Sequence, residues 1–149
     1  MTSNIVISPA VKADLPFIYQ LDQVSFTGEG YPAFFLRQAF DCWRNHFWVI
    51  KQEDDVIAYL LLVPSSETKG DGWILSLAVS EHARGQGLAK QLIQHAIDHA
   101  TDFQRLLLTV SPDNLAALAL YQQFGFTEIE QEYDYFEPGD CRSILGLTL

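Results

Sequence analysis

The chain has 149 residues, of which 48% are apolar, and a formal net charge of -10. This length favours a single domain with its own core, and the acidic balance argues against nucleic acid as a partner, because phosphate binding needs a basic surface. No stretch approaches the eighteen apolar residues of a membrane helix, and residues 1–4 lack the basic start of a secretion signal. We therefore expect a cytoplasmic protein that has no membrane partner.

The first third of the chain predicts one short strand and two helices. The strand is expected at residues 4–7, and residues 14–26 have the pattern of a helix that Asp14 caps. A glycine-containing turn breaks this pattern before Pro32, which can begin a second helix at residues 33–43. The aromatic residues of this second helix should mostly join the core: Phe34, Phe35, Phe40 and Trp43.

The rest of the chain alternates apolar strands with amphipathic helices. The expected ranges are strands at 47–52, 56–63 and 73–79, a helix from 88 to about 100, a strand at 105–110, a helix at 114–124, and strands at 127–135 and 142–149. Residues 64–72 have the composition of a surface loop. Strands at both ends with helices between them predict an α+β or mixed α/β fold in three layers.

A glycine-rich turn, Arg84-Gly85-Gln86-Gly87, connects the strand at 73–79 to the following helix. Without side chains at the glycines, successive N–H groups can point at one anion together with the positive end of the helix dipole, and a guanidinium suits phosphate oxygens. A tight connection without any ligand could have the same composition. A P-loop would need a Gly-Lys-Ser/Thr triplet, which the chain lacks, and a dinucleotide loop would need glycine in place of Lys90.

A second motif follows the strand at 105–110 and consists of Asn114, Ala117, Tyr121 and the pair Gly125-Phe126. Together with Arg84-x-x-Gly87-x-Ala89, this motif resembles the two cofactor motifs of the GNAT superfamily of acyl-CoA-dependent N-acetyltransferases. The resemblance spans residues 73–126 and implies acetyl-CoA as co-substrate. It also implies a single-domain fold over residues 1–149, with a central twisted, mostly antiparallel sheet of about seven strands, a parallel splayed pair in its middle, and helices on both faces.

The resemblance further implies which residues bind acetyl-CoA. The strand backbone at 77–79 would pair with the pantetheine arm, the turn would hold the pyrophosphate, and Asn114 would bond to a pantetheine amide. Alternatively or in addition, Asp113 or Asn114 simply caps the helix. The cofactor set is Leu77, Ala78, Val79, Arg84, Gly85, Gln86, Gly87, Leu88, Ala89, Lys90, Asn114, Ala117 and Tyr121. Tyr121 is the catalytic candidate, because a phenol protonated at neutral pH can protonate the leaving thiolate. The alternative is a helix tyrosine packed into the core.

Three further residues are candidates for contact with the acceptor. Glu29 and Tyr31 lie between the two early helices, which line the acceptor side in GNAT-like proteins, although an ordinary exposed loop has the same composition. The triplet Asp134-Tyr135-Phe136 resembles the tyrosine-rich hairpin of ribosomal-protein and other N-terminal acetyltransferases, which adds Tyr135. Acids at 128, 130, 132 and 134 alternate along one face of the predicted strand, and they would either select a cationic substrate or form a solvated face.

The general base is not evident from the sequence. Related enzymes that acetylate protein N-termini often carry a glutamate on the strand before the second motif, where this chain has Thr109. Glu81, Asp71, Glu29 or a bound water could replace it. The missing base leaves open a non-catalytic acyl-CoA sensor as the alternative to an N-acetyltransferase acting on a primary amine, and a nucleotide-binding domain is a third hypothesis.

Cysteine and histidine usage predicts neither a disulfide nor a metal. Cys42 and Cys141 are isolated, so both are expected to be reduced. His95 and His99 are spaced as zinc ligands on a helix, but a solvated helix flank is the favoured interpretation. We expect no metal cofactor, a small-molecule or peptide amine as substrate, and a monomer or homodimer.

Overall fold

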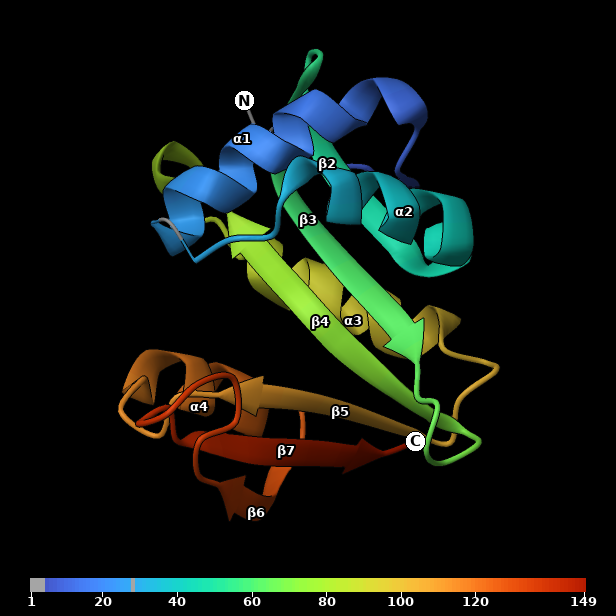
Figure 1. The fold of residues 1–149 in the computed structure, drawn as a ribbon. Coiled ribbons are helices and arrows are strands. Elements are labelled where there is room, and N and C mark those ends of the chain that lie inside the picture. Colours follow the sequence, from blue (N-terminus) through green and yellow to red (C-terminus); the bar gives the residue numbers. More distant parts are fainter. Residues whose placement is uncertain (1–4, 28) are drawn as a thin grey trace. The chain divides into compact units, whose positions relative to one another are not determined.

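The computed structural model describes residues 5–27 and 29–149, so Asn4 of the first predicted strand and Gly28 lie outside the described residues. The described residues form one mixed sheet of seven strands in the order β1-β2-β3-β4-β5-β7-β6, with four α-helices (Figure 1). The strands are β1 (Ile7–Pro9), β2 (Phe47–Gln52), β3 (Asp55–Pro64), β4 (Asp71–Val79), β5 (Arg105–Val110), β6 (Thr127–Glu132) and β7 (Arg142–Thr148). The helices are α1 (Leu15–Phe26), α2 (Ala33–Trp43), α3 (Leu88–His99) and α4 (Leu115–Gln122). The pair β4 and β5 is parallel, which confirms the predicted mixed α/β class with a parallel pair in the middle of the sheet.

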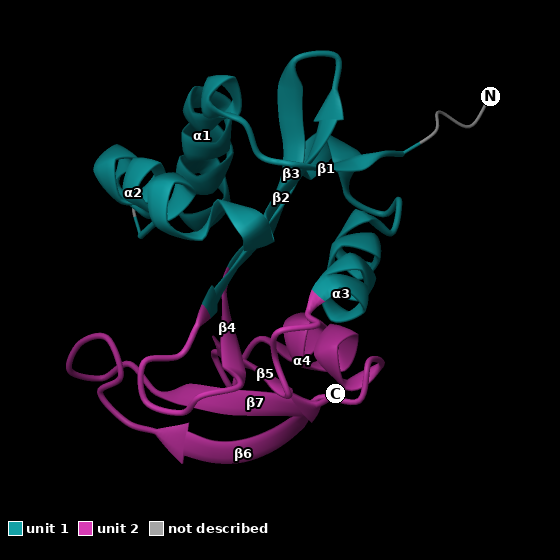
Figure 2. Cartoon of the chain, turned by 90° about the vertical axis from the view of Figure 1, so that its right-hand side faces the viewer, with its two compact units in different colours: residues 1–63, 76–99 teal, residues 64–75, 100–149 magenta. Residues whose placement is uncertain are grey.

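The chain divides into two compact units (Figure 2). Unit 1 comprises Met1–Val63 and Ser76–His99, and unit 2 comprises Pro64–Leu75 and Ala100–Leu149. The boundary runs through β4, whose first half belongs to unit 2 and whose second half belongs to unit 1. The expectation of one domain over residues 1–149 stays a prediction.

Unit 1 has its core on both faces of β2 and β3. Residues 47–50 and 56–63 are all buried, because α1 and α2 cover one face of these strands and α3 covers the other (Figure 2). Strands covered on both sides are continuously apolar rather than alternating. On α2 the buried residues are Leu36, Ala39 and Phe40. Of the four aromatic residues predicted to be mostly core, only Phe40 is therefore buried: Phe35 and Trp43 are half-buried, and Phe34 is 69% exposed.

The start of α1 differs from the sequence prediction in its cap. Asp14 directly precedes the helix but makes no capping hydrogen bond to it. Its carboxylate instead accepts a hydrogen bond from the N–H of Val11 at 2.9 Å and pairs with Lys51 Nζ at 3.2 Å. Asp14 therefore closes the short 3-10 turn Lys12–Asp14 before α1, and the predicted capping role is incorrect.

Unit 2 contains β5, β7 and β6 with α4 on one face (Figure 2). The predicted strand 127–135 ends at Glu132, and its register shifts between Glu128, which pairs with Leu145, and Glu130, which pairs with Ile144. Adjacent residues of β7 point to opposite faces, so this bulge puts Glu128 on the opposite face from Glu130. The prediction that the acids at 128, 130, 132 and 134 share one strand face is therefore wrong, and Asp134 lies beyond the strand.

Candidate active site

The turn between β4 and α3 in unit 1 has the backbone that the sequence predicts. Gly85 and Gly87 have φ angles of +82° and +75°, in the left-handed region that favours glycine, and a Cβ built on either would meet nothing within 4 Å. The N–H of Gln91 donates to the Gly87 carbonyl at 3.1 Å as α3 begins. By helix geometry the N–H groups before Gln91 in the first turn have no carbonyl partner within the helix. The exposed turn therefore offers main-chain donors and open space to an anion.

The side chains of this turn divide into buried and exposed ones. Leu88 is buried, so it can meet a ligand only through its main chain, whereas Arg84, Gln86 and Lys90 are exposed and Ala89 is half-buried. Arg84 Nε donates to the Val79 carbonyl at 3.4 Å. The turn thus combines free space above two glycines with two cationic side chains, which suits a phosphate ester.

The β4 residues before the turn alternate in burial. Ala78 is buried, whereas Leu77 and Val79 are half-buried. Immediately after them, the N–H of Ser80 donates to the Ile57 carbonyl at 2.8 Å, which fixes the end of β4 to β3. The segment that the resemblance assigns to pantetheine is therefore held in place.

A cavity of about 800 Å³ lies beside the turn within unit 1. The α1 side of its lining includes Phe17, Gln20 and Val24, and the other side includes His82 and Arg84. Ser80 Oγ lies 2.8 Å from His82 Nδ1, so this rim is itself hydrogen-bonded. The cavity shares Arg84 with the phosphate-type turn, and its mixture of apolar and charged groups would accept a partly polar ligand.

In unit 2 the second motif begins with a capped helix. Asn114 is the N-cap of α4, and its Oδ1 accepts a hydrogen bond from the N–H of Ala117 at 3.1 Å, which confirms the capping alternative. Ala117 is therefore placed through its main chain. Because Oδ1 is used in the cap, the donor that Asn114 could offer a ligand is its side-chain NH₂ group.

Tyr121 lies near the end of α4. Its ring makes an edge contact with Phe126, with the ring centroids 5.6 Å apart. Burial raises the pKa of Tyr121 to about 12, so the phenol stays protonated throughout the neutral range. A protonated phenol on a short helix is compatible with a general acid as well as with a packed side chain.

In unit 2, neither Asp71, a candidate base, nor Thr109, which occupies the position of the glutamate in related enzymes, is well suited to accept a proton. Thr109 is half-buried on β5, where it pairs with Ile144 of β7, and a threonine hydroxyl is a weak proton acceptor. Asp71 is buried, and its two oxygens accept hydrogen bonds from Arg105 Nε at 3.1 Å and Arg105 Nη2 at 2.6 Å. This bidentate pair occupies the Asp71 carboxylate, which argues against Asp71 as the base.

A second cavity, of about 590 Å³, lies within unit 2. It is lined by the Asp71–Arg105 pair and by Trp73, Glu130 and Tyr135, among others. Glu128 does not line it, because the bulge turns that residue to the other face, where a hydrogen bond with Ser143 lowers the pKa of the Glu128 carboxyl. Burial, and secondarily the charge of Glu132, raises the pKa of Tyr135.

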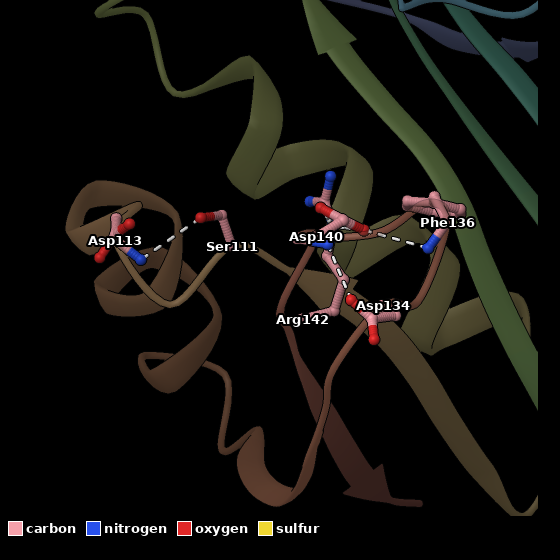
Figure 3. A network of polar contacts seen from close by, with 7 residues as sticks. Ser111, Asp113, Asp134, Phe136, Asp140 and Arg142 are labelled. Atoms are coloured by element: carbon pink, nitrogen blue, oxygen red, sulfur yellow. Dashed lines mark hydrogen bonds and ion pairs between the residues drawn. The ribbon is translucent and has the colours of Figure 1, made fainter.

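The loop between β6 and β7 is organised by two carboxylates (Figure 3). Asp134 accepts a hydrogen bond from the N–H of Gly139 at 2.7 Å, and Asp140 accepts bonds from the N–H of Phe136 and from Arg142 Nε. The Arg142 guanidinium also lies 5.0 Å from the centre of the Phe136 ring. Tyr135 therefore lies in a loop with internal hydrogen bonds, not in the strand that the sequence predicts.

The remaining acceptor candidates lie in unit 1, between α1 and α2. Glu29 is exposed, and Tyr31 is half-buried with its ring stacked on Phe35 at a centroid distance of 4.4 Å. Sequence reasoning did not find that the N–H of Tyr31 donates to the carboxylate of Asp22, which is buried. The available signal was an aspartate on the apolar face of α1, four residues after Ile18.

The cysteines are free thiols, and His95 and His99 form an aromatic cluster with Trp48. Cys42 is exposed and Cys141 is half-buried. His95 and His99 stack at 3.9 Å, and His95 meets Trp48 edge-on at 5.1 Å, so this helix flank is packed and not simply solvated. Burial, followed by the charge of His99, lowers the pKa of His95. Among the residues that the structure describes, no group of three or more His, Cys, Asp or Glu could hold a metal ion.

Comparison with known proteins assigns the part of the chain that contains both motifs to one family. A sequence model described as "Acetyltransferase (GNAT) family" matches residues 15–126. The N-alpha-acetyltransferase of Sulfolobus acidocaldarius is 26% identical over 160 residues, covering 98% of this chain and 94% of that protein. Four other curated relatives are longer, and the chain spans 39% to 51% of their length.

Solved structures share the fold over nearly the whole chain. A crystal structure of the NatC complex bound to Gag peptide and CoA matches with a TM-score of 0.85 and 24% identity, covering 99% of both chains. The ribosomal-protein-S18-alanine N-acetyltransferase from Escherichia coli matches with a TM-score of 0.82 and 22% identity, covering 97% of this chain and 94% of that chain. Similarity at these identities shows the common fold.

Proposed function

The chain belongs to the acetyltransferase (GNAT) family, and from this premise we propose that its acceptor is the α-amino group of a peptide or protein N-terminus. The enzyme is an N-acetyltransferase, and acetyl-CoA is its co-substrate. A sensor that binds acyl-CoA without turnover is not favoured, because the relatives are named for the transfer reaction.

The single observation that carries the choice of acceptor is that Thr109, and not a carboxylate, occupies the β5 position before the second motif. Thr109 stands on β5 where a carboxylate would serve, and the Asp71 carboxylate is bound at both oxygens by Arg105. Deprotonating a lysine-like amine at pH 7 costs roughly 4 to 5 kcal/mol, whereas an α-amino group costs about 1 kcal/mol. An α-amine is therefore the acceptor that needs a base least, and a water or the exposed Glu29 or Glu81 would suffice to take its proton.

Both motifs take part in binding acetyl-CoA in this proposal. Main-chain N–H groups at Gly85, Gly87 and the first turn of α3 bind the diphosphate, and Arg84 and Lys90 supply positive charge. The backbone of residues 77–79 binds the pantetheine arm, and the NH₂ group of Asn114 donates to one of its amide carbonyls. Support for this assignment comes from the open space above the two glycines and from the use of Asn114 Oδ1 in the cap.

Tyr121 acts as the general acid in the same proposal. The neutral amine attacks the thioester carbonyl, the new C–N bond forms, and the C–S bond breaks as the tyrosine hydroxyl protonates the departing thiolate. The attacking nitrogen becomes positively charged and loses a proton to solvent or to the base, and one proton from the same source returns to the tyrosine oxygen, which restores the phenol. Its raised pKa supports this role, because the acid form is the one present at neutral pH.

A panel of acceptors incubated with acetyl-CoA tests the proposal. The panel contains hexapeptides with free α-amino groups, the same peptides with a blocked N-terminus and one internal lysine, polyamines and aminoglycosides, and mass spectrometry locates the acetyl group. We expect acetylation of the free α-amine and little reaction of the blocked peptides. Reaction confined to lysine or polyamines would overturn the proposed acceptor, and CoA binding without thiol release from any amine would indicate the sensor.

Location and assembly stay predictions of the sequence. Within the described part of the chain, no helix has the length and apolar content to cross a membrane. The cytoplasmic location, the lack of nucleic acid or membrane partners, and the monomeric or homodimeric state are expectations that fractionation and light scattering would check.

A further inference from the structure

A buried carboxylate in unit 1 has no role in the proposed transfer step. Asp22 on α1 is 0% exposed, and its two oxygens accept hydrogen bonds from different parts of the unit. One oxygen accepts from the hydroxyl of Tyr59 on β3, and the other accepts from the N–H of Tyr31 at 2.6 Å. The Tyr59 hydroxyl lies 2.6 Å from Oγ of Ser76 on β4.

The direction of this hydrogen-bond chain follows from the number of hydrogens. Both oxygens of Asp22 accept, as an ionised carboxylate does, and a tyrosine hydroxyl has a single hydrogen to donate. Because that hydrogen goes to Asp22, the hydroxyl of Ser76 must donate to Tyr59. Burial, and then the charge of Asp22, raises the pKa of Tyr59, so Tyr59 keeps its proton and stays a donor to the carboxylate.

At the end of this hydrogen-bond network opposite Ser76, Asp22 holds the α1–α2 segment, which is residues 29–32 and contains Glu29 and Tyr31. The Tyr31 main chain is bound on both sides, because its N–H donates to Asp22 and its carbonyl accepts from Gln23 Nε2 at 2.9 Å. Gly30 fits so closely that an added Cβ would overlap the Asp22 carboxylate and come within 3.0 Å of Gln23 Nε2. The segment is thereby tied to consecutive residues of α1.

A buried ionised group is expensive to hold, and a well-packed apolar residue in its place is often as stable or more stable. Retaining Asp22 in the core of unit 1 therefore points to a geometric role. Since no part of Asp22 is exposed, it cannot touch a substrate and must act through the segment that it binds.

We propose that Asp22 is a positioning residue that fixes the α1–α2 segment to the sheet through Tyr59, so that Glu29 and Tyr31 meet the acceptor amine in one arrangement. This inference rests on the proposed function, because it assigns Glu29 and Tyr31 to acceptor binding. It predicts that loss of the hydrogen bonds from residue 22 to Tyr31 and Tyr59 weakens acceptor binding and leaves acetyl-CoA binding nearly unchanged.

Variants at Asp22 test the inference against matched variants at Asp41, an exposed aspartate of α2 that pairs with Arg37. The variants are Asp22→Ala, Asp22→Asn, Asp41→Ala and Asp41→Asn, assayed with acetyl-CoA and the best free-amine hexapeptide of the panel. For Asp22→Ala we expect the KM for the peptide to rise roughly tenfold or more, and the KM for acetyl-CoA to stay within about twofold. Asp22→Asn should recover most of the loss, because its Oδ1 can accept from Tyr31 while its NH₂ donates to Tyr59, whose hydroxyl then turns to Ser76.

Gly30→Ala provides an independent variant that leaves the carboxylate intact. Its added methyl group should push the segment away from Asp22 and raise the peptide KM as Asp22→Ala does, so the inference stays testable if Asp22→Ala fails to fold. Hydrogen exchange at the Tyr31 amide, followed by NMR, reports on the segment without any substrate. That amide should be protected in the natural protein and in both Asp41 variants, and should exchange faster in Asp22→Ala and Gly30→Ala.

The two measurements separate the possible failures. Faster exchange at Tyr31 with an unchanged peptide KM would overturn the role in acceptor binding, and unchanged exchange would overturn the tether itself. An enzyme that acetylates no free amine would overturn the proposed function, whereas the exchange data would still decide whether Asp22 holds the segment.

Discussion

The two strand-to-helix corners of the molecule solve the same structural problem in opposite ways. Between β4 and α3, two glycines with positive φ lead into a twelve-residue helix that buries Leu88, Leu92, Ile93 and Ala96. Between β5 and α4, Asn114 caps an eight-residue helix that has no fully buried residue. The first helix is held by packing, and because glycines precede it, no glycine side chain can accept a hydrogen bond from the N–H groups of its first turn. In the second helix, the Asn114 side chain accepts a hydrogen bond from one of these N–H groups, that of Ala117.

This difference indicates that the β4–α3 corner is suited to bind an anion, whereas the β5–α4 corner is suited to place side chains for the reaction. Main-chain N–H groups at an open helix start favour an anion, so the β4–α3 corner suits the diphosphate. A capped helix has fewer main-chain N–H groups available to a ligand, so the β5–α4 corner contributes to the site through its side chains, Asn114 and Tyr121. We therefore expect substitutions at the first corner to abolish cofactor binding, and substitutions at the second to have smaller effects, on turnover at Tyr121 and on acetyl-CoA binding at Asn114.

The largest effect is expected from Gly87→Glu. Its side chain would occupy the open space above the turn, add negative charge at the anion site, and strain a backbone with φ of +75°. We expect the affinity for CoA, measured by calorimetry, to fall by at least about a hundredfold. Gly139→Glu is the matched control, because Gly139 also has positive φ (+88°) and open space, but lies in the β6–β7 loop. Equal losses in the two variants would show that charge or strain alone, and not the turn, is responsible.

A smaller effect, on turnover alone, is expected from Tyr121→Phe. Removing the hydroxyl should lower kcat roughly ten- to a thousandfold while CoA affinity is nearly kept. Because the pKa of Tyr121 is raised to about 12, the acid form persists well above neutrality, and kcat/KM of the natural enzyme should rise as the amine deprotonates, without a fall caused by Tyr121 below about pH 11. Tyr133→Phe, at a residue that is 74% exposed, is the control. Unchanged kcat in Tyr121→Phe would remove the phenol from the mechanism.

The sequence predicted the features that depend on residues close in the chain. The glycine turn, the ranges of α2, β2 and β5, and the cap at Asn114 all follow from patterns within a few residues, and the structure confirms them. Local rules were also insufficient in places: Asp14 had a suitable position to cap α1 but binds the N–H of Val11 instead. Capping propensity does not distinguish a helix start from a turn that immediately precedes it.

The features that the sequence could not predict depend on distant partners. Asp22 is buried because Tyr59, 37 residues later, donates to it, and no helical pattern contains that information. The bulge at Ile129 lies against β7, the next strand of the sheet, where Gly146 pairs with Thr127 and a Cβ added to Gly146 would overlap the Ile129 side chain. The register shift decides which face each glutamate of β6 occupies, and so which acids line the cavity of unit 2.

The smallest expected effect separates the two roles of Asn114. Asn114→Ser keeps a side-chain oxygen that can cap α4 but lacks the NH₂ donor, whereas Asn114→Ala removes both. If the NH₂ group binds pantetheine, both variants should raise the KM for acetyl-CoA about equally, by roughly three- to tenfold. Thermal unfolding should distinguish them, since only Asn114→Ala loses the cap, at a cost of about 1 kcal/mol. A KM that rises only in the alanine variant would mean that Asn114 acts through the helix and not on the cofactor, which would leave Tyr121 as the principal side chain that the β5–α4 corner contributes to the reaction.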